Sequence, residues 1–419
     1  MDIERIERVR ANLRRRDLTQ LLIVDPLSIW WLTGYYTEPL ERLLALYLPL
    51  DGTPTLFVNR LFPDASATGA RVVSHSDTDD PIPMLCDAID TARPLGVDKE
   101  LAARWLVPLM QAGAAANFVL ASDAVDDARA IKDAREQELM RIASRTNDEA
   151  MAWLAEQVRP GATELDIAEG LLATYRRLGA QDHSFSPIVS FGAHAADPHH
   201  EPDATPLAPG DMVLFDVGCK RDGYCSDMTR TFFTAEPTEH QRAVYDAVRR
   251  ANEAAEAIVR PGVTFAEIDL TARRIIEDAG WAQFNHRLGH QIGLQDHEPG
   301  DVSATHDEPV QPGMCFSIEP GIYLPGDMGV RIEGQPRHRH RERLRGAQQL
   351  PQGHPGARVE IGQSLQHRPT PKHESPGDRN ASASRAILST NRAPDERLRG
   401  IPAATSQRGE SGRRSPWRS

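Results

Sequence analysis

An internal repeat is the feature that most limits how this chain can fold. The segment VRPGATELDIAEGLLATYRRLGA at 158–180 matches VRPGVTFAEIDLTARRIIEDAGW at 259–281, an offset of 101 residues. In each copy Pro-Gly interrupts a helical pattern, and Thr163 or Thr264 can cap the helix that follows. A strand-rich segment comes after each copy. The repeat predicts a domain of two similar halves, each a helix pair backed by strands, related by a pseudo-two-fold axis.

A different pattern precedes the repeat. Residues 1–131 alternate strand and helix signals, including a buried-strand run at 21–25 and a hairpin signal at Asp51-Gly52. This alternation predicts an α/β domain. A long helical pattern at 132–158 then opens the repeated, α+β domain, which we place at 132–333. A chain of 419 residues is too long for one core, so two domains are expected.

Charge is distributed unevenly along the chain. Residues 334–419 hold 17 Lys+Arg and 7 Asp+Glu, which leaves 31 and 53 for residues 1–333. The acidic body argues against nucleic acid or an anionic membrane as a partner. The N-terminus lacks an apolar signal region, and no apolar run approaches the ~20 residues of a membrane span. Four scattered cysteines fit a reducing compartment. We therefore expect a cytoplasmic protein.

The composition changes abruptly at Gly334. The 86 residues from there to the end contain 16 Arg and one aromatic residue, Trp417, and hydrophobic periodicity disappears. This composition predicts disorder. A nucleic-acid-binding tail is disfavoured because no aromatic residues are interleaved with the arginines. Because the break falls in mid-strand, a shifted reading frame is the simplest explanation, with a genuine extension as the alternative.

Four carboxylates lie at matching places in the two halves. In MVLFDVGCKRDGYCSDMTRTFF (212–233), a turn centred between Arg221 and Asp222 places Asp216 directly opposite Asp227. In MCFSIEPGIYLPGDMGVRIE (314–333), a turn centred on Gly326 places Glu319 opposite Glu333. Facing like charges destabilise a hairpin, so a cation is expected between them. Two divalent ions would balance the four negative charges, and a two-metal site can clamp a water and a substrate oxygen together.

Histidines lie between and beside these hairpins. The segment HRLGHQIGLQDHEPG (286–300) contains His286, His290 and His297, and DPHHEP (197–202) contains His199. An oxygen-rich site with one imidazole suits Mn²⁺, Co²⁺, Fe²⁺ or Zn²⁺ better than Ca²⁺. His194, His200 and His286 are interpreted as surface or structural residues, and the Trp30-Trp31 pair as core.

The motifs DVGCKRDGYCSDMTRTF, GHQIGLQDHEP, SIEPGIY and GVRIE resemble those of the pita-bread metallopeptidases, the family of methionine aminopeptidase, aminopeptidase P, prolidase and creatinase. The resemblance covers roughly 132–333. The preceding domain resembles the creatinase-like N-terminal domain of the Xaa-Pro branch, which points to a prolidase-like Xaa-Pro dipeptidase. The sequence departs from the family pattern in two places. Arg287-Leu288-Gly289 precedes His290, whereas the family more often has a small polar residue before the glycine. The resemblance also stops after Glu333.

The resemblance also implies roles for particular residues. It implies two divalent ions, most often Mn²⁺, a peptide substrate and a homodimer. Asp227 and Glu333 would bridge the ions, His199 and His297 would hold the substrate carbonyl and the tetrahedral intermediate, Arg331 would support the bridging Glu333, and Glu319 would also relay a proton. The implied metal ligands are Asp216, Asp227, His290, Glu319 and Glu333.

Other functions were weighed against this one. An aminopeptidase P-type enzyme acting on longer peptides shares the same motifs. Creatinase-like hydrolysis works without the metal set, and five intact ligands argue against it. A non-catalytic peptide-binding relative would typically have lost ligands. Taken alone, each acidic residue is more often a turn or solvated strand residue. A loop histidine such as His199 or His297 is often a polar surface residue, and Arg331 can simply pair with a carboxylate.

Overall fold

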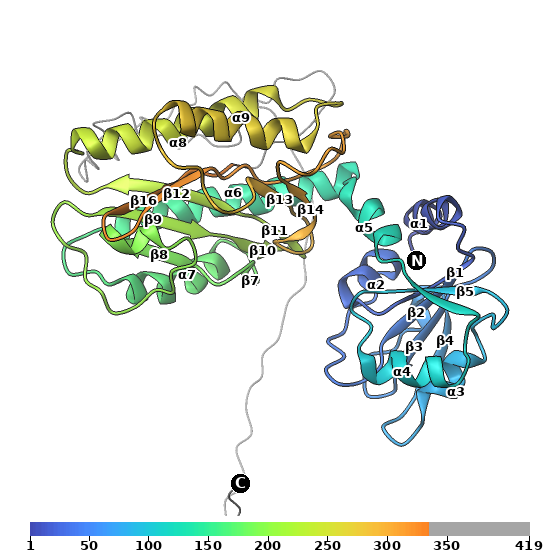
Figure 1. Cartoon of the computed structure of the whole chain (residues 1–419). Coiled ribbons are helices and arrows are strands. Elements are labelled where there is room, and N and C mark those ends of the chain that lie inside the picture. Colours follow the sequence, from blue (N-terminus) through green and yellow to red (C-terminus); the bar gives the residue numbers. More distant parts are fainter. Residues whose placement is uncertain (335–419) are drawn as a thin grey trace, which may run out of the picture. The chain divides into compact units, whose positions relative to one another are not determined.

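The structure is a computed structural model that describes residues 1–334. It confirms the predicted fold class: an α/β region comes first, followed by an α+β region with two similar halves (Figure 1). The expectations for the tail fall on residues 335–419, outside the described residues. Among residues 1–334, no helix is long and apolar enough to cross a membrane.

A six-stranded sheet organises the first region, in the order β4-β3-β2-β1-β5-β6. The predicted hairpin is confirmed, because β2 and β3 pair antiparallel on either side of Asp51-Gly52. The strands are β1 (Gln20–Ile23), β2 (Ala45–Pro49), β3 (Thr55–Asn59), β4 (Arg71–His75), β5 (Pro94–Val97) and β6 (Asn117–Leu120).

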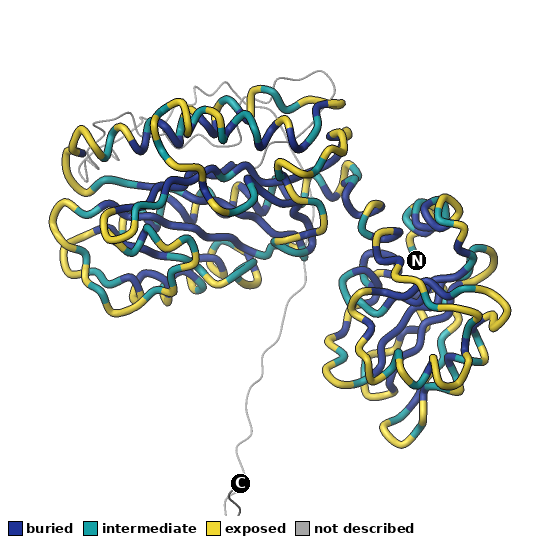
Figure 2. Tube along the Cα trace, viewed as in Figure 1, coloured by how far each residue is buried: buried dark blue, intermediate teal, exposed yellow. Residues whose placement is uncertain are grey.

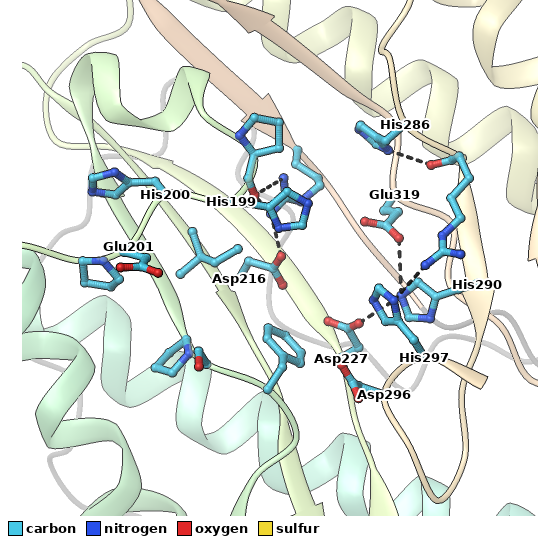
Figure 3. Close-up of a pocket in the computed structure, with 18 residues that line it drawn as sticks. His199, His200, Glu201, Asp216, Asp227, His286, His290, Asp296, His297 and Glu319 are labelled. Atoms are coloured by element: carbon cyan, nitrogen blue, oxygen red, sulfur yellow. Dashed lines mark hydrogen bonds and ion pairs between the residues drawn. The ribbon is translucent and has the colours of Figure 1, made fainter. Parts of the chain in front are cut away.

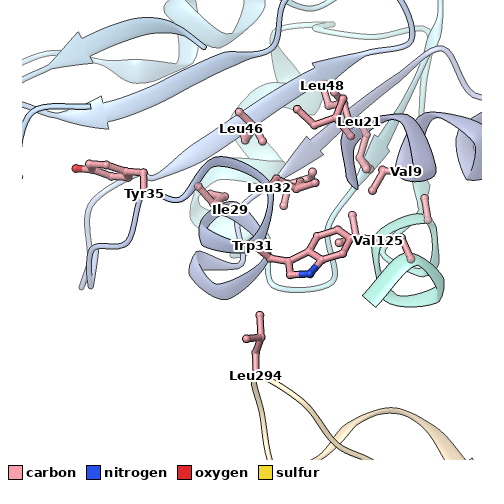
Figure 4. Packing of buried hydrophobic residues seen from close by; sticks show 14 of the residues in the cluster. Val9, Leu21, Ile29, Trp31, Leu32, Tyr35, Leu46, Leu48, Val125 and Leu294 are labelled. Atoms are coloured by element: carbon pink, nitrogen blue, oxygen red, sulfur yellow. The ribbon is translucent and has the colours of Figure 1, made fainter. Parts of the chain in front are cut away.

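Helices supply the rest of this region's core. Figure 4 shows Leu21, Leu46 and Leu48 of the sheet facing Ile29 and Leu32 of α2. Trp31 is buried, as expected for a core residue, and its indole N–H donates to Glu136 Oε1 at 2.7 Å. The helices are α1 (Ile3–Arg15), α2 (Pro26–Thr33), α3 (Pro81–Cys86), α4 (Ala103–Gln111) and α5 (Asp123–Ala130), with a 3-10 turn η1 (Ser66–Thr68).

The repeat appears as two helix pairs. Thr163 caps α7 and Thr264 caps α9, as the sequence predicts. Each threonine also forms a β-bridge, Thr163 with Pro206 and Thr264 with Pro309, so the two copies are anchored alike. Figure 1 shows α8 and α9 packed side by side over the strands. The pairs are α6 (Ala134–Gln157) with α7 (Glu164–Arg177), and α8 (Glu239–Ile258) with α9 (Phe265–Asp278).

The first hairpin adopts a different register from the predicted one. Asp216 lies opposite Thr229, because the tight turn is Asp222-Gly223 rather than Arg221-Asp222. Both turn residues have positive φ (51° and 85°), which a two-residue hairpin turn of this hand requires. The strands of this half are β7 (Asp182–His183), β8 (Ile188–Phe191), β9 (Met212–Val217), β10 (Cys219–Arg221), β11 (Tyr224–Cys225) and β12 (Met228–Phe233), with a 3-10 helix η2 (Gly192–Ala196).

The second hairpin has the predicted register. Gly321 pairs with Arg331 and Ile318 bridges Gly334, so Glu319 and Glu333 occupy opposite positions, and Gly326 occupies the turn with φ 78°. Figure 2 shows that the strands of this region are largely buried. The strands of this half are β13 (Gly289–Gln291), β14 (Glu298–Val302), β15 (Gly321–Leu324) and β16 (Met328–Arg331).

Candidate metal centre

The carboxylates of the first half lie at the end of a buried strand pair. Asp216 belongs to β9, in which every residue is buried, and Asp227 directly precedes β12. The register differs from the predicted one by two residues. Because side chains alternate along a strand, an even shift keeps both carboxylates on one face. Both line one cavity of about 470 Å³ (Figure 3).

Residues of the second half reach the same place. His290 Nε2 lies 3.5 Å from Asp227 Oδ2 and 3.5 Å from Glu319 Oε1. Donor atoms of Asp227, His290 and Glu333 all lie within 4.8 Å of one another, and all three residues are buried. The backbone joins the halves as well, because the Glu333 amide donates to Thr229 O at 3.2 Å. Asp216, Asp227, His290 and Glu319 line the cavity, and Glu333 lies beside Asp227 and His290, so the structure brings together the five residues expected from the sequence.

Electrostatics makes this arrangement unfavourable without a cation. Burial and the neighbouring carboxylates Asp216 and Glu319 raise the pKa of Asp227 well above its ordinary value. Burial and Asp227 raise the pKa of Glu333 in the same way. In the described part of the chain, Asp216 Oδ1 and Glu333 Oε1 are buried and have no hydrogen-bond donor. A divalent ion would supply the charge and the partner that these oxygens need, so the residues fit a metal.

The ring of His290 is also oriented so that it could bind a metal ion. Its Nδ1 lies 3.1 Å from Gln291 O, an acceptor, so the proton resides on Nδ1 and the lone pair of Nε2 faces the carboxylates. Ser317 supports this arrangement: its hydroxyl accepts the His290 amide at 3.0 Å and contacts Glu319 Oε1 at 3.1 Å. Gly289 allows this close approach, because a Cβ there would lie 2.1 Å from Ser317 O.

Arg331 contacts a different carboxylate from the one expected. Its guanidinium donates to Asp216 Oδ2 at 2.5 Å and to Thr229 Oγ1 at 3.1 Å, while the Thr229 hydroxyl donates to Glu333 Oε2 at 3.0 Å. Arg331 therefore reaches Glu333 only through Thr229. Tyr323 completes the group by accepting from Arg331 at 3.0 Å.

His297 lies against the centre with a defined tautomer. Its ring is 3.8 Å from that of His290, and Arg287 donates to its Nδ1 at 2.8 Å. Because Nδ1 accepts, the ring proton resides on Nε2. Burial and the nearby His290 lower the pKa of His297 to about 4, so the ring is neutral at pH 7. A neutral imidazole that presents an N–H can donate to a carbonyl oxygen.

The loop that carries His297 is held by a buried ion-pair cluster. Glu298 contacts Arg129 at 2.6 Å and Lys132 at 3.0 Å, and accepts the Leu294 amide at 2.9 Å. Burial alone would raise the pKa of Glu298, but Lys132 and Arg129 lower it to about 2. Gly293 is required here because a Cβ would lie 2.7 Å from a Glu298 carboxylate oxygen. The cluster thus fixes the residue next to His297.

More histidines line the cavity than the sequence analysis predicted. His199 is exposed and lines the cavity, as expected. His286 and His200, interpreted from sequence as surface or structural, also line it. His286 contacts the Tyr323 hydroxyl at 3.0 Å, and burial lowers its pKa to about 4. His194 lies with His200 against the buried carboxylate of Glu164.

Several supporting residues were missed by the sequence analysis. Thr229 could have been found, because Asp227, Thr229 and Thr231 alternate along one strand and therefore share a face. The contacts of Ser317 and Glu298 lie 27 and up to 169 residues away in sequence, and no local pattern reports them.

Comparison with known proteins agrees with this geometry. The family model "Metallopeptidase family M24" matches residues 138–335, and "Creatinase/Prolidase N-terminal domain" matches 5–131. A putative dipeptidase of Bacillus subtilis, YkvY, is 36% identical over 344 residues, covering 79% of this chain and 94% of the relative.

Comparison with solved structures indicates the same kind of protein. The dipeptidase PepE from Mycobacterium ulcerans has a TM-score of 0.75 at 36% identity, covering 80% of this chain and 92% of that one. A prolidase from Thermococcus sibiricus has a TM-score of 0.74 at 33% identity, covering 80% and 94%. The chain therefore belongs to metallopeptidase family M24 and is a metallopeptidase of the dipeptidase and prolidase type.

Proposed function

We propose that this chain is a dinuclear-metal peptidase that hydrolyses Xaa-Pro dipeptides or the N-terminal Xaa-Pro bond of short peptides. One observation carries the proposal: carboxylates from both halves and one imidazole converge in a single cavity. Its volume of about 470 Å³ lies in the range of small-molecule sites, so a dipeptide is a suitable occupant. The relatives named dipeptidase and prolidase support the same substrate class.

The proposed ligand set is the one expected from the sequence. Asp227 and Glu333, the most buried of the four proposed carboxylate ligands, would bridge two ions. The oxygen-rich set with one imidazole favours Mn²⁺, with Co²⁺, Zn²⁺ and Fe²⁺ as alternatives. The proposed ligands are Asp216, Asp227, His290, Glu319 and Glu333.

The chain's own residues then have separate tasks. Divalent ions held here would supply Lewis-acid activation of water and of the substrate carbonyl. His297, neutral and protonated on Nε2, would donate to the carbonyl oxygen as it becomes negative. His199, across the cavity, would hold the same group. Arg331 would hold Asp216 in place through its 2.5 Å contact.

Glu319 would move the proton. It lies beside His290 at the edge of the cavity, and its side chain is 16% exposed, more than that of Asp227 at 6%. A carboxylate at that position can take a proton from water and deliver it to the leaving nitrogen. Proline makes this delivery essential, because its amide nitrogen carries no hydrogen.

Location and assembly remain parts of the proposal. All four cysteines are free thiols, and three of them are buried, which is consistent with a reducing cytoplasm. The resemblance implies a homodimer, which light scattering of the purified protein would measure.

A peptide panel tests the proposal. Protein freed of metal with a chelator would be assayed on Ala-Pro, Ala-Ala and Ala-Pro-Ala, alone and after addition of Mn²⁺, Co²⁺ or Zn²⁺. We expect hydrolysis of Ala-Pro only after a metal is restored. Full activity in verified metal-free protein would refute the mechanism. Faster cleavage of the tripeptide would identify an aminopeptidase P-type enzyme, and binding without cleavage a peptide-binding relative.

A further inference from the structure

A second cluster of potential metal ligands surrounds Glu164, the first residue of α7. Its side chain is fully buried. Oε1 accepts the Phe191 amide at 2.7 Å and contacts His194 Nδ1 at 3.0 Å. Oε2 contacts His200 Nε2 at 2.7 Å and accepts the Asp203 amide at 3.3 Å. One carboxylate therefore holds two imidazoles in place.

The donor atoms are close enough to share one ion. One atom each from Glu164, His194, His200 and Asp203 lie within 4.8 Å of one another. The centroids of the two imidazole rings lie 4.3 Å apart, and the ring planes are tilted by 38° to each other. Ligands at about 2.0–2.2 Å from a zinc ion are roughly 3.3 Å apart. The contacts of Glu164 with His194 (3.0 Å) and His200 (2.7 Å) are slightly shorter, so these two need to widen by only a few tenths of an ångström when the shared protons leave.

The charge balance also favours a cation. Hydrogen bonds from the side chain and backbone of Thr205 lower the pKa of Asp203, which keeps it ionised. The first turn of α7 favours negative charge on Glu164. Within residues 1–334, the ion pairs of Glu164 are with His194 and His200, which carry charge only when protonated. With neutral rings, the two carboxylates carry two negative charges, which one divalent ion would neutralise.

We propose that Glu164, His194, His200 and Asp203 form a separate binding site for a divalent transition-metal ion of the zinc class. Two imidazoles and two carboxylates match the donor preference of zinc, and differ from the oxygen-rich set around Asp227. The site does not depend on the proposed peptidase mechanism.

The site would act on the loop that carries His199. His194 and Asp203 lie on either side of His199 in the chain, and His200 follows it directly. Figure 3 shows His200 beside His199 on the wall of the cavity. An ion held by all four ligands would tie both ends of this loop to α7 and thereby limit the movement of His199.

Zinc counting on untagged protein tests the site. Metal-free parent, His194→Ala and Asp203→Asn would be loaded with Zn²⁺ alone, passed through a desalting column and analysed for zinc per chain. The matched control is His240→Ala, which removes an exposed histidine that pairs with Asp327 in the other half. We expect the parent and the control to hold one more zinc than His194→Ala, and Asp203→Asn to bind that ion at least about 10-fold more weakly.

The comparison isolates this site from the central one. The difference between parent and His194→Ala does not depend on how many ions Asp227 and its neighbours hold, so it can fail while the peptidase proposal stands. His194 is 36% exposed, and circular dichroism of each variant would verify folding. Equal zinc in folded parent and His194→Ala, or an equal loss in His240→Ala, would overturn the proposal.

Discussion

The two halves of the metallopeptidase domain share a scaffold and differ in what they attach to it. The long first helix of each half, α6 or α8, carries a buried asparagine that holds the backbone next to a carboxylate. Asn147 donates to Val217 O at 2.8 Å, next to Asp216, and Asn252 donates to Ile318 O at 2.8 Å, next to Glu319. Each half also has its own apolar core. The features common to both halves are thus those that position strands.

The differences lie in the loops and at the helix starts. Glu164 and Phe265 are equivalent residues after the capping threonines. Glu164 contacts His200 and the Asp203 amide of the loop that carries His199, whereas Phe265 is buried and stacks on His306 at 4.8 Å. The proposed imidazole ligand, His290, comes from the second half. The internal repeat therefore accounts for the matching positions of the four carboxylates. Differences between the halves at a few positions account for the different side chains around them.

The largest expected effect tests whether the halves contribute equally to one centre. Asp227→Asn and Glu333→Gln should each reduce bound metal to well under two ions and lower kcat/KM at least about 10³-fold, because a bridging carboxylate serves both ions. Metal analysis and peptide assays measure this. Asp327→Asn, in an exposed turn, is the control. If only one of the two variants lost metal, the centre would belong to a single half.

The two cavity histidines allow a second test. His297→Ala should keep its metal and lose about 10²–10³-fold in kcat, equivalent to roughly 3 kcal/mol, because an N–H aimed at the developing charge is removed. His199→Ala should also keep its metal but lose less, since its ring lacks the support that Arg287 and His290 give His297. A His297 variant without metal would show that this role is wrong.

The ion pairs of Glu298 test the loop of the second half that carries His297. Glu298→Gln should lower the free energy of unfolding at pH 7 by about 3 kcal/mol, because Arg129 and Lys132 lose a buried partner. The pKa of Glu298 is about 2 in the folded protein against an ordinary 4.5. Its contribution is therefore complete above pH 4.5 and is lost as the pH falls towards 2.

Urea unfolding of metal-free protein at several pH values measures this effect. The difference between parent and variant should shrink below pH 4.5. Glu308→Gln, whose side chain is 76% exposed, is the control and should show almost no difference. A difference that stayed constant with pH would mean that the carboxylate charge is not the source of the stability.

The smallest effects concern the shared scaffold. Asn147→Ala removes the side-chain hydrogen bonds to Val217 O and from the Tyr175 hydroxyl, and Asn252→Ala removes those to Ile318 O and Ile332 O. Each should cost about 2 kcal/mol, because buried polar groups lose hydrogen bonds. Equal losses in urea unfolding would support structural equivalence of the halves, and a silent variant in either half would contradict it.

Local patterns in the sequence were sufficient for the scaffold. The Pro-Gly and threonine signals located α7 and α9, and the glycine turn at Gly326 set the register of Glu319 against Glu333. These features depend on neighbouring residues: a cap bonds within one turn, and a tight turn aligns the strands on either side. The first hairpin was misaligned because Asp222-Gly223, rather than Arg221-Asp222, forms its turn.

Tertiary structure alone decided the partners of the charged groups. Arg331 binds Asp216 across 115 residues, Glu298 binds Arg129 across 169, and Glu164 gathers His194 and His200. The residues that neighbour them in the sequence do not predict these contacts. A buried charge binds whichever opposite charge or donor the folded chain brings within about 3 Å, and that proximity is set by the packing of whole helices and strands.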